Sequence, residues 1–364
     1  MIYCINRIKK EKVVGQRTAG KKAPDDVAAI VSKEFGGQVF HFYETRIEKK
    51  GILRVIGKYL INRKNWNSLL KIVKERDIVI VQHPYEGIKQ SEKMLKKCHK
   101  SGAAIILVIH DLSTLRHNID IKESGLMEAL NYKAEIGSLL EADYVICHNS
   151  KMKKHLVQSG ISEKKIYCLG IFDYLFSGDT IPERHLSKEV CIAGNLSKYK
   201  SGYLYKYINS KADYSLKLYG PNYEEQSNES ITYMGILPPD KLPGVLEGAF
   251  GLVWDGDDLE SCTGVAGEYI KMNNPHKCSL YFAANMPVII WKEAALADYV
   301  IENGLGLAVD RLGDISDAVS KLDNQQYNEM VNRVISVGET IRNGINLKAV
   351  LTMILDCDSK DADE

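Results

Sequence analysis

Short apolar runs alternate with longer segments of helical periodicity through the first half of the chain. Four apolar runs of strand length lie at 1–6, 77–84, 103–111 and 142–150. Segments with helical spacing occur at 25–35, 89–100 and 121–140, and another begins at residue 150. Repeated strand–helix order is typical of a parallel sheet with helices on both faces. The pattern therefore predicts an α/β, Rossmann-like domain over residues 1–170.

A second alternation begins at residue 189, after a segment without periodicity. Residues 171–188 contain Gly, Pro and many charges, which is typical of a linker. Apolar runs then recur at 190–195, 214–220, 231–235, 250–256, 286–290 and 305–309. Helical segments are expected at 201–208, 239–246, 275–284, 293–302 and 314–322. We predict a second Rossmann-like domain over 189–340, a C-terminal helix over 341–356 and a frayed acidic tail over 357–364.

Composition narrows the classes of function. The 364 residues carry 48 Lys plus Arg against 47 Asp plus Glu, and this balance gives no general field for nucleic acid. Eight scattered cysteines without a CxxC pair predict reduced, buried thiols. No run of 18 apolar residues is present, which predicts a soluble, cytoplasmic protein that is at most attached to a membrane surface.

The basic, amphipathic segment 46–66 leaves two interpretations open. Its Lys and Arg residues alternate with Ile, Leu and Val, as in helices that bind an anionic bilayer surface. The same pattern also fits an ordinary helix with one solvated face, and we favour this simpler interpretation.

Polar and glycine-rich segments follow several strands of the second half, at the positions where parallel sheets bind ligands. Gly194 would let the backbone approach a ligand, and Asn195 and Lys198 would donate to a phosphate. A plain turn would explain the same residues. Tyr219, with the Gly220 and Pro221 that follow it, would form a platform for a base or simply end a strand.

A stronger signal lies at the predicted start of the helix over 275–284. Asn274 is a plausible cap and Pro275 suits the first turn. Lys277 in that turn opposes the positive end of the helix dipole, which an anion bound there would explain. We therefore expect a diphosphate at this helix start, with a lysine on the surface as the alternative.

Two acidic residues allow a metal interpretation of the loop after 250–256. Asp255 and Asp257 could hold a divalent cation against phosphates, although a solvated acidic loop is favoured. A calcium loop is excluded because Leu259 stands where a ligand is required.

In the first half, His110 and Asp111 end one apolar run, and Gln82 and His83 end another. An imidazole or carboxylate at such a position could take a proton from an attacking hydroxyl, or could merely cap the next turn. Residues 16–26, which include Gly20, are expected to form a loop opposite the second domain's donor site. They contain no GxGxxG fingerprint.

Several of these segments together resemble the β-1,6-galactofuranosyltransferase family of bacterial polysaccharide synthesis. They are "AGKKA", "VIHDLSTLR", "ADYVICHNSKM", "IAGNLSK", "GAFGLVWDGDDLE" and "EYIKMNNPHKCSLYFAANMPVII". The streptococcal glucosyltransferase that extends GlcNAc on serine-rich adhesins is a more distant likeness. The resemblance implies a GT-B fold, in which two Rossmann-like domains face a cleft and a C-terminal helix crosses back to the first.

The resemblance also implies an inverting, metal-independent transfer from a UDP-sugar, without a cofactor. Donor-site residues would be Asn274, His276, Lys277, Tyr269, Gly194, Asn195, Lys198, Tyr219, Gly220 and Pro221. Asp111 or His110 would deprotonate the acceptor, with Gly20 and His83 on the acceptor side.

The acceptor would be a glycan on a lipid carrier or glycoprotein. The protein could act at the inner face of the membrane, and it could form a homo-oligomer. Three alternatives remain: a glucosyltransferase that uses UDP-glucose, a metal-dependent transferase, and a non-catalytic subunit that binds nucleotide sugars.

Overall fold

The computed structural model describes residues 1–9, 19–44, 52–85, 88–116, 126–207, 213–224 and 228–361. The chain forms two compact units. Unit 1 comprises Met1–Gln16, Pro24–Leu169 and Leu347–Glu364, and unit 2 comprises Arg17–Ala23 and Gly170–Asn346. The last helix of the chain is therefore counted largely with unit 1, as the GT-B resemblance implies.

The sheet of unit 1 contains six parallel strands within the described residues, in the order β2-β1-β3-β4-β5-β6. The strands are β1 (Ile2–Lys9), β2 (Gln38–Glu44), β3 (Ile78–His83), β4 (Ala104–Ile109), β5 (Tyr144–Cys147) and β6 (Ile166–Cys168). β3 and β4 are almost wholly buried, which explains their nearly unbroken apolar sequences.

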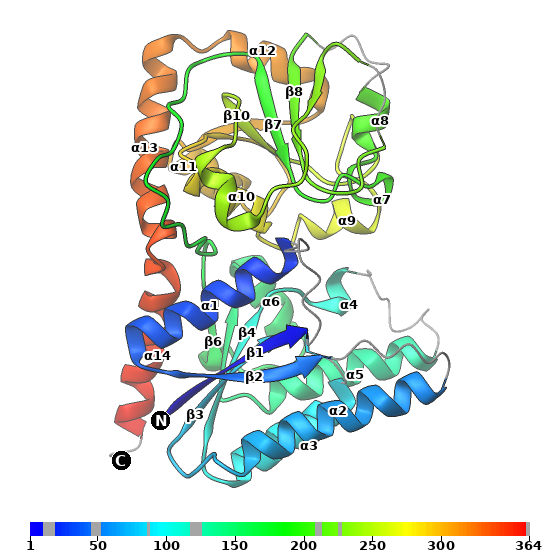
Figure 1. Cartoon of the computed structure of the whole chain (residues 1–364), viewed down its shortest axis with the longest axis vertical. Coiled ribbons are helices and arrows are strands. Elements are labelled where there is room, and N and C mark those ends of the chain that lie inside the picture. The colour runs from blue at the N-terminus through cyan, green and yellow to red at the C-terminus, as the bar shows by residue number, and fades with distance from the viewer. Residues whose placement is uncertain are drawn as a thin grey trace. The chain divides into compact units, whose positions relative to one another are not determined.

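Helices connect these strands and cover the sheet of unit 1. They are α1 (Ala19–Phe35), α2 (Ile52–Leu70), α3 (Ile88–Lys100), α4 (Ser113–Arg116), α5 (Leu126–Leu140), α6 (Ser150–Gln158) and α14 (Ile345–Asp361), with a short 3₁₀ turn at Glu163–Lys165. Figure 1 shows α2, α3 and α5 packed side by side. On α14, Lys348 forms an ion pair with Glu34 of α1 at 2.6 Å, which ties the C-terminal helix to this unit.

Unit 2 has a second parallel sheet, in the order β12-β11-β10-β7-β8-β9 within the described residues. Its strands are β7 (Glu189–Ala193), β8 (Ser215–Tyr219), β9 (Ile231–Tyr233), β10 (Phe250–Val253), β11 (Val288–Trp291) and β12 (Gly306–Val309). All six were predicted, because each is a short apolar run between turn residues. β10 and β11 lie near the centre and are fully buried.

Helices surround the second sheet (Figure 1), and most of them are short. They are α7 (Lys198–Ser201), α8 (Tyr203–Tyr207), α9 (Gly264–Tyr269), α10 (His276–Ala283), α11 (Ala297–Glu302), α12 (Ile315–Ser320) and α13 (Asn324–Arg342), with 3₁₀ turns at Pro239–Gly244 and Leu312–Asp314. α13 starts with a capping box at Asp323 and packs along α10. The two units give the predicted GT-B fold.

The extended segment before β7 is part of unit 2, although it contains no helix or strand. Its Arg184 is 6% exposed, and the guanidinium donates to the carbonyl oxygens of Leu246 at 2.7 Å and Ala284 at 2.7 Å. Tyr174 donates its hydroxyl to the carbonyl of Pro239 at 2.8 Å. These contacts fix the predicted linker to the core of the unit.

Several local predictions were wrong. β2 and β6 were not predicted, because they lie at the two opposite edges of the sheet and are only partly buried, and β6 has only three residues. Residues 19–26, expected in a loop, are helical in α1, while 16–18 lie outside the described residues. The acidic tail is helical to Asp361. Two cysteines, Cys168 and Cys357, are exposed.

Among the described residues, none of the helices is both long and apolar enough to cross a lipid bilayer.

Candidate functional site

The first turn of α10 carries Lys277, the cation that the sequence places at the wrong end of a helix. Its ammonium donates to the Asp255 carboxylate at 2.6 Å and to the Trp254 carbonyl at 2.9 Å. The two side chains of the ion pair are 11% and 7% exposed. Lys200 lies 3.6 Å from the second carboxylate oxygen of Asp255. The anion that Lys277 faces is therefore a carboxylate of the same chain.

The start of α10 has no side-chain cap. The N-cap is Pro275, whose side chain supplies no acceptor, although its carbonyl accepts from the Cys278 N–H at 2.9 Å. The N–H groups of His276 and Lys277 have no intrahelical partner. The predicted cap at Asn274 is wrong, because its amide donates instead to the carbonyl of Gly170. Unpaired N–H groups and the helix dipole together favour an anion at this place.

His276 is packed as a neutral side chain. Its ring stacks on Tyr174 with a centroid distance of 5.0 Å, and Nε2–H donates to the carbonyl of Asp173 at 3.2 Å. Burial lowers the pKa of His276 to about 4; the hydrogen bond to Asp173 opposes this shift, and the positive charge of Lys22 adds to it. At neutral pH His276 therefore brings no charge to a phosphate, and it holds the start of α10 against the extended segment.

Two glycines bring the ends of β7 and β8 into contact. Gly194 donates its N–H to the Tyr219 carbonyl at 2.9 Å, and Gly220 has a φ of 139°. A Cβ at Gly220 would lie 1.8 Å from the Gly194 carbonyl oxygen, so only glycine fits there. In contrast, a Cβ at Gly194 would meet nothing within 4 Å. The space beside the Gly194 backbone is therefore open, and ligand binding there stays a prediction.

Asn195 and Lys198 are already engaged within the chain. The Asn195 side-chain oxygen accepts from the Ser197 N–H at 3.1 Å and from the Asn222 amide at 2.9 Å. Lys198 forms an exposed ion pair with Glu224 at 2.5 Å, and this hydrogen bond raises the pKa of Lys198. Lys200, two residues further on, is the lysine of this turn that reaches Asp255, and sequence reasoning missed it.

The aromatic residues of the predicted nucleoside site are buried. Tyr219 is 2% exposed, and its hydroxyl donates to the Val245 carbonyl at 3.3 Å and accepts from the Glu247 N–H at 3.0 Å. Tyr269 is 5% exposed. Pro221 is half-buried and accepts from the backbone N–H of Leu196 at 3.0 Å. A platform made by the Tyr219 ring is therefore excluded, because that ring belongs to the core.

The acidic loop after β10 is occupied by contacts of its own. Asp255 lies between two lysines, and Asp257 accepts from the Thr263 hydroxyl at 2.6 Å. Within the described ranges, no group of three or more His, Cys, Asp or Glu side chains could hold a metal ion. The surroundings of Asp255 do not suit a cation, because two ammonium groups already neutralise the carboxylate.

In unit 1, the ends of β3 and β4 are joined by a hydrogen bond between His110 and Gln82. The Gln82 amide nitrogen donates to the carbonyls of Ile5 and Pro24, both at 3.1 Å, which turns its oxygen toward His110. The His110 Nε2 lies 2.7 Å from that oxygen. Because the oxygen only accepts, Nε2 carries the proton in neutral His110 and Nδ1 carries the lone pair.

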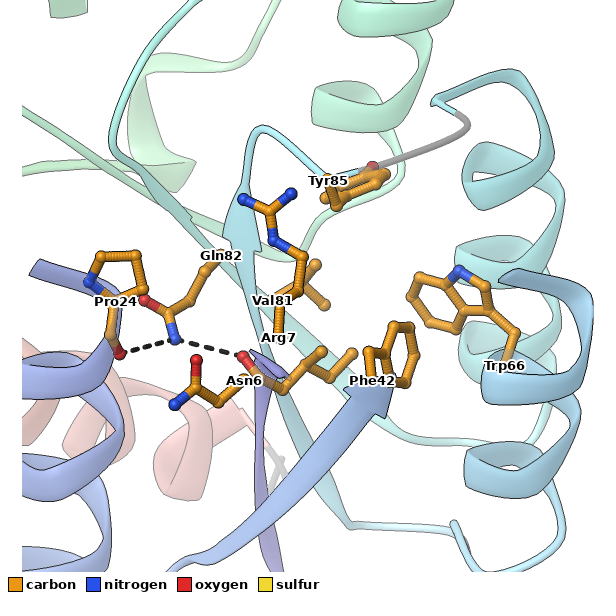
Figure 2. A pocket seen from close by; sticks show the side chains of 9 residues that line it. Asn6, Arg7, Pro24, Phe42, Trp66, Val81, Gln82 and Tyr85 are labelled. Carbon is orange, nitrogen blue, oxygen red and sulfur yellow. Dashed lines mark hydrogen bonds between the residues drawn. The ribbon is translucent and has the colours of Figure 1, made fainter. Parts of the chain in front are cut away.

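A small, partly open hollow lies next to Gln82 at the same edge of the sheet. Figure 2 shows Phe42, Trp66 and Tyr85 on one side of it and the polar Asn6 and Gln82 on another. An apolar surface with a few fixed polar groups is typical of sites for small ligands such as sugar rings. The sequence did not predict this pocket, because its walls come from β1, β2, β3, α1 and α2, which are far apart along the chain.

His83 lies in the interior beside this pocket. The side chains of His83 and Glu135 are 0% and 1% exposed, and Nε2 lies 2.8 Å from the carboxylate. Glu135 also accepts from the N–H groups of Ser113 at 3.0 Å and Thr114 at 2.9 Å. Burial alone would raise the pKa of Glu135, but the hydrogen bonds from His83 and Thr114 prevail and lower it to about 2. The prediction that His83 contacts the acceptor is therefore wrong, because the ring has no exposed surface.

The two remaining first-half residues lie near the surface. Asp111 forms an ion pair with Arg116 at 3.2 Å. Gly20 is exposed in the first turn of α1, where a Cβ would meet nothing within 4 Å, and this turn is grouped with unit 2. Neither observation tests a role in acceptor binding.

Two family models match the chain almost from end to end. The glucosyltransferase 3-like N-terminal domain matches residues 3–171, and the glucosyltransferase 3-like C-terminal domain matches residues 190–354. These matches agree with the resemblance drawn from the sequence motifs.

Two relatives and one solved structure are also similar. The β-1,6-galactofuranosyltransferase WbbI of Escherichia coli (strain K12) is 35% identical over 259 residues, 69% of this chain and 71% of that one. Glucosyltransferase 3 of Streptococcus gordonii is 25% identical over 93% of this chain and 94% of its own. The Anabaena protein Alr3699/HepE, solved in complex with UDP, superposes with a TM-score of 0.59 at 10% identity, over 98% and 99% of the two chains. At that identity the last match shows the fold alone.

Proposed function

The chain belongs to the glucosyltransferase 3-like family of bacterial glycosyltransferases, and we propose that it transfers galactofuranose from a UDP-sugar to a glycan hydroxyl. The proposed reaction is an inverting displacement that needs no metal ion. It would contribute to a cell-surface polysaccharide or glycoconjugate.

The start of α10 supports this proposal most directly. An ammonium group has three N–H donors, and Lys277 gives one to Asp255 and one to Trp254. The third can donate to a phosphate, next to the uncapped N–H groups of the helix. Asp255 and Trp254 hold the cation in place before a donor binds, so little reorganisation is needed when negative charge develops on the departing UDP. Lys200 brings a second positive charge to the same place.

Neutralisation by lysine explains how the transfer would proceed without a metal. A divalent cation in a glycosyltransferase would stabilise the leaving diphosphate, and here Lys277 and the dipole of α10 provide the same charge. We therefore propose that chelators leave the activity unchanged. A loss of activity in EDTA that Mg²⁺ or Mn²⁺ restores would favour the metal-dependent alternative instead.

On unit 1, we propose His110 as the general base. Gln82 fixes the proton on Nε2, so Nδ1 is the basic nitrogen. This atom is buried in the structure, and it would accept the proton of the acceptor hydroxyl only after a local opening exposes it. Asp111 is the weaker candidate, because Arg116 already pairs with its carboxylate. The small hollow beside Gln82 would contact an edge of the acceptor sugar.

The identity of the donor sugar is the most specific part of the proposal. The galactofuranosyltransferase is the more identical relative, whereas glucosyltransferase 3 covers more of the chain, so UDP-glucose is the second candidate. Thermal unfolding with UDP-galactofuranose, UDP-galactopyranose, UDP-glucose and UDP-GlcNAc ranks them, since a bound ligand stabilises by mass action. We expect UDP-galactofuranose to raise Tm most. A larger shift with UDP-glucose would reassign the sugar, and no shift with any of them would refute the donor site.

Turnover separates an enzyme from a binding subunit. We expect slow release of UDP from the stabilising sugar nucleotide in water, and faster release when a glycan acceptor is added. Nuclear magnetic resonance of the product would show the inverted anomeric configuration. Retention of configuration would contradict the displacement proposed for His110.

A further inference from the structure

The N-terminal half of α2 exposes apolar side chains on the side turned away from the core. Val55 and Tyr59, toward the Trp66 side of the helix, are exposed as well, at 66% and 49%. The buried side of the helix is formed by Asn62, Trp66 and Leu69. Leu53 and Leu60 are each 55% exposed, and Ile56 is 47% exposed.

These three exposed residues form one stripe. At about 100° per residue, Leu60 lies within roughly 20° of Leu53 around the helix axis, and Ile56 lies within roughly 60° of it. Trp66 lies about 140° away on the same wheel. The stripe of Leu53, Ile56 and Leu60 is therefore nearly opposite the face that packs on the sheet, where a solvated helix carries polar side chains.

The charge of α2 has one sign. The helix contains Arg54, Lys58, Arg63 and Lys64 and neither Asp nor Glu. In the part of the chain that the structure describes, Arg54, Arg63 and Lys64 form no ion pair with a carboxylate. Arg63 and Lys64 follow Leu60 directly, so these positive charges border the apolar stripe.

We propose that this face of α2 binds the surface of an anionic lipid bilayer. Leu53, Ile56 and Leu60 would enter the boundary between headgroups and acyl chains, while Arg63 and Lys64 bind phosphate groups of the lipids. A second copy of the chain fits less well, because two α2 helices packed together would oppose like charges without an acid on either helix. Figure 1 shows α2 at the outside of unit 1, beside α3.

The proposed membrane binding is a property separate from the transfer reaction. It rests on the proposed function in one respect, the attachment of the acceptor glycan to a lipid. Binding to the bilayer would hold unit 1, with its acceptor pocket, near membrane-bound substrates. It also revises the simpler interpretation of segment 46–66, of which 46–51 lie outside the described residues, because exposed apolar side chains accompany the lysines and arginines of α2.

Vesicle sedimentation with the full chain tests the surface without any sugar nucleotide. We expect binding to vesicles of phosphatidylglycerol and phosphatidylcholine, little binding to phosphatidylcholine alone, and release by high salt. The double variant Arg63→Gln/Lys64→Gln should bind the anionic vesicles roughly 30-fold more weakly, because each basic residue near the surface contributes about fivefold. The triple variant Leu53→Ser/Ile56→Ser/Leu60→Ser should lose binding altogether.

A matched control places the same charge change elsewhere. Lys241→Gln/Lys321→Gln removes two exposed lysines of unit 2 and should bind vesicles like the unchanged protein. All variants should keep their thermal unfolding and the Tm shift with UDP-sugar, which separates this test from that of the donor site. The proposal is overturned if the unchanged protein ignores anionic vesicles, or if the control weakens binding as much as the α2 variants do. It is also overturned if the triple variant only converts an oligomer to a monomer in sedimentation velocity.

Discussion

The carboxyl ends of the strands carry different kinds of polar side chains in the two units. In unit 2, Lys277 and Lys200 surround Asp255 at the uncapped start of α10, so positive charge is concentrated there. In unit 1, the comparable edge has His110 and Gln82 in a hydrogen-bonded chain that ends on backbone carbonyls. One edge is suited to bind a developing anion, and the other to fix the position of a proton. Similar sheets therefore support different chemical roles through the side chains at their carboxyl ends.

The largest effect is expected at the proton-handling edge. His110→Ala should lower kcat by about 100- to 10,000-fold, because the acceptor hydroxyl loses its base. Asp111→Asn should retain most of the activity, since Arg116 already pairs with that carboxylate. The measurement is steady-state release of UDP at saturating donor. The reverse order, with Asp111→Asn the more damaging change, would move the base to Asp111.

A stability test probes the buried support of the same edge. Glu135→Gln should lower the free energy of unfolding by about 3 to 5 kcal/mol, because it disrupts a fully buried pair with His83. The comparison variant Glu141→Gln changes a partly exposed pair with Lys96 at 3.5 Å and should cost less than about 1 kcal/mol. Urea unfolding at pH 7 gives both values.

The pH dependence of Glu135 has a definite sign. Its pKa is lowered from 4.5 to about 2, so its contribution to stability is complete above pH 4.5 and is lost as the pH falls through about 2. The difference between the unchanged protein and Glu135→Gln should therefore shrink on acidification. A difference that stays constant from pH 7 to pH 3 would contradict the ionised carboxylate.

The anion-binding edge should respond to the loss of Lys277. Lys277→Ala should lower kcat/KM by about 100- to 1,000-fold, or about 2.7 to 4 kcal/mol, and should weaken the Tm shift with UDP. Lys271→Ala nearby removes a lysine paired with Glu268 and Glu293 and serves as the control. Near-normal turnover of Lys277→Ala would eliminate the diphosphate assignment.

The smallest effect concerns thiols and should leave activity unchanged. Cys168 at the end of β6 lies 3.7 Å from Cys147, whose hydrogen bond lowers the pKa of Cys168 to about 7. In unit 2, burial raises the pKa of Cys191 and of Cys278. Iodoacetamide should therefore label Cys168 quickly, with a rate that rises around pH 7, while the two buried thiols react slowly.

A variant without the neighbouring thiol sharpens this result. Cys147→Ala should shift the labelling midpoint of Cys168 upward, toward the ordinary value near 8.5. Mass spectrometry of the labelled peptides follows each thiol separately. If the labelling of Cys168 were unchanged in this variant, the hydrogen bond from Cys147 would not be the cause of the lowered pKa of Cys168.

The sequence predicted the parallel order of both halves because central strands such as β4 and β11 are continuous apolar runs. It could not predict β2, which lies at the edge and alternates in exposure. For the site, the charge of Lys277 led to the prediction of a diphosphate, which stays a prediction. The carboxylate that Lys277 contacts is Asp255, which follows another strand and is placed by tertiary packing. His83 and Tyr219 were misplaced because a strand end in sequence does not show whether a side chain points into the core.

Arg184 has a practical consequence for dividing the chain into fragments. The glucosyltransferase 3-like C-terminal model begins at residue 190, which suggests cloning from β7. Such a fragment would lack the guanidinium that satisfies the carbonyls of Leu246 and Ala284, and would leave these buried oxygens unpaired. A fragment meant to contain the proposed donor-binding unit alone should start no later than Gly170, so that it keeps the extended segment with Arg184.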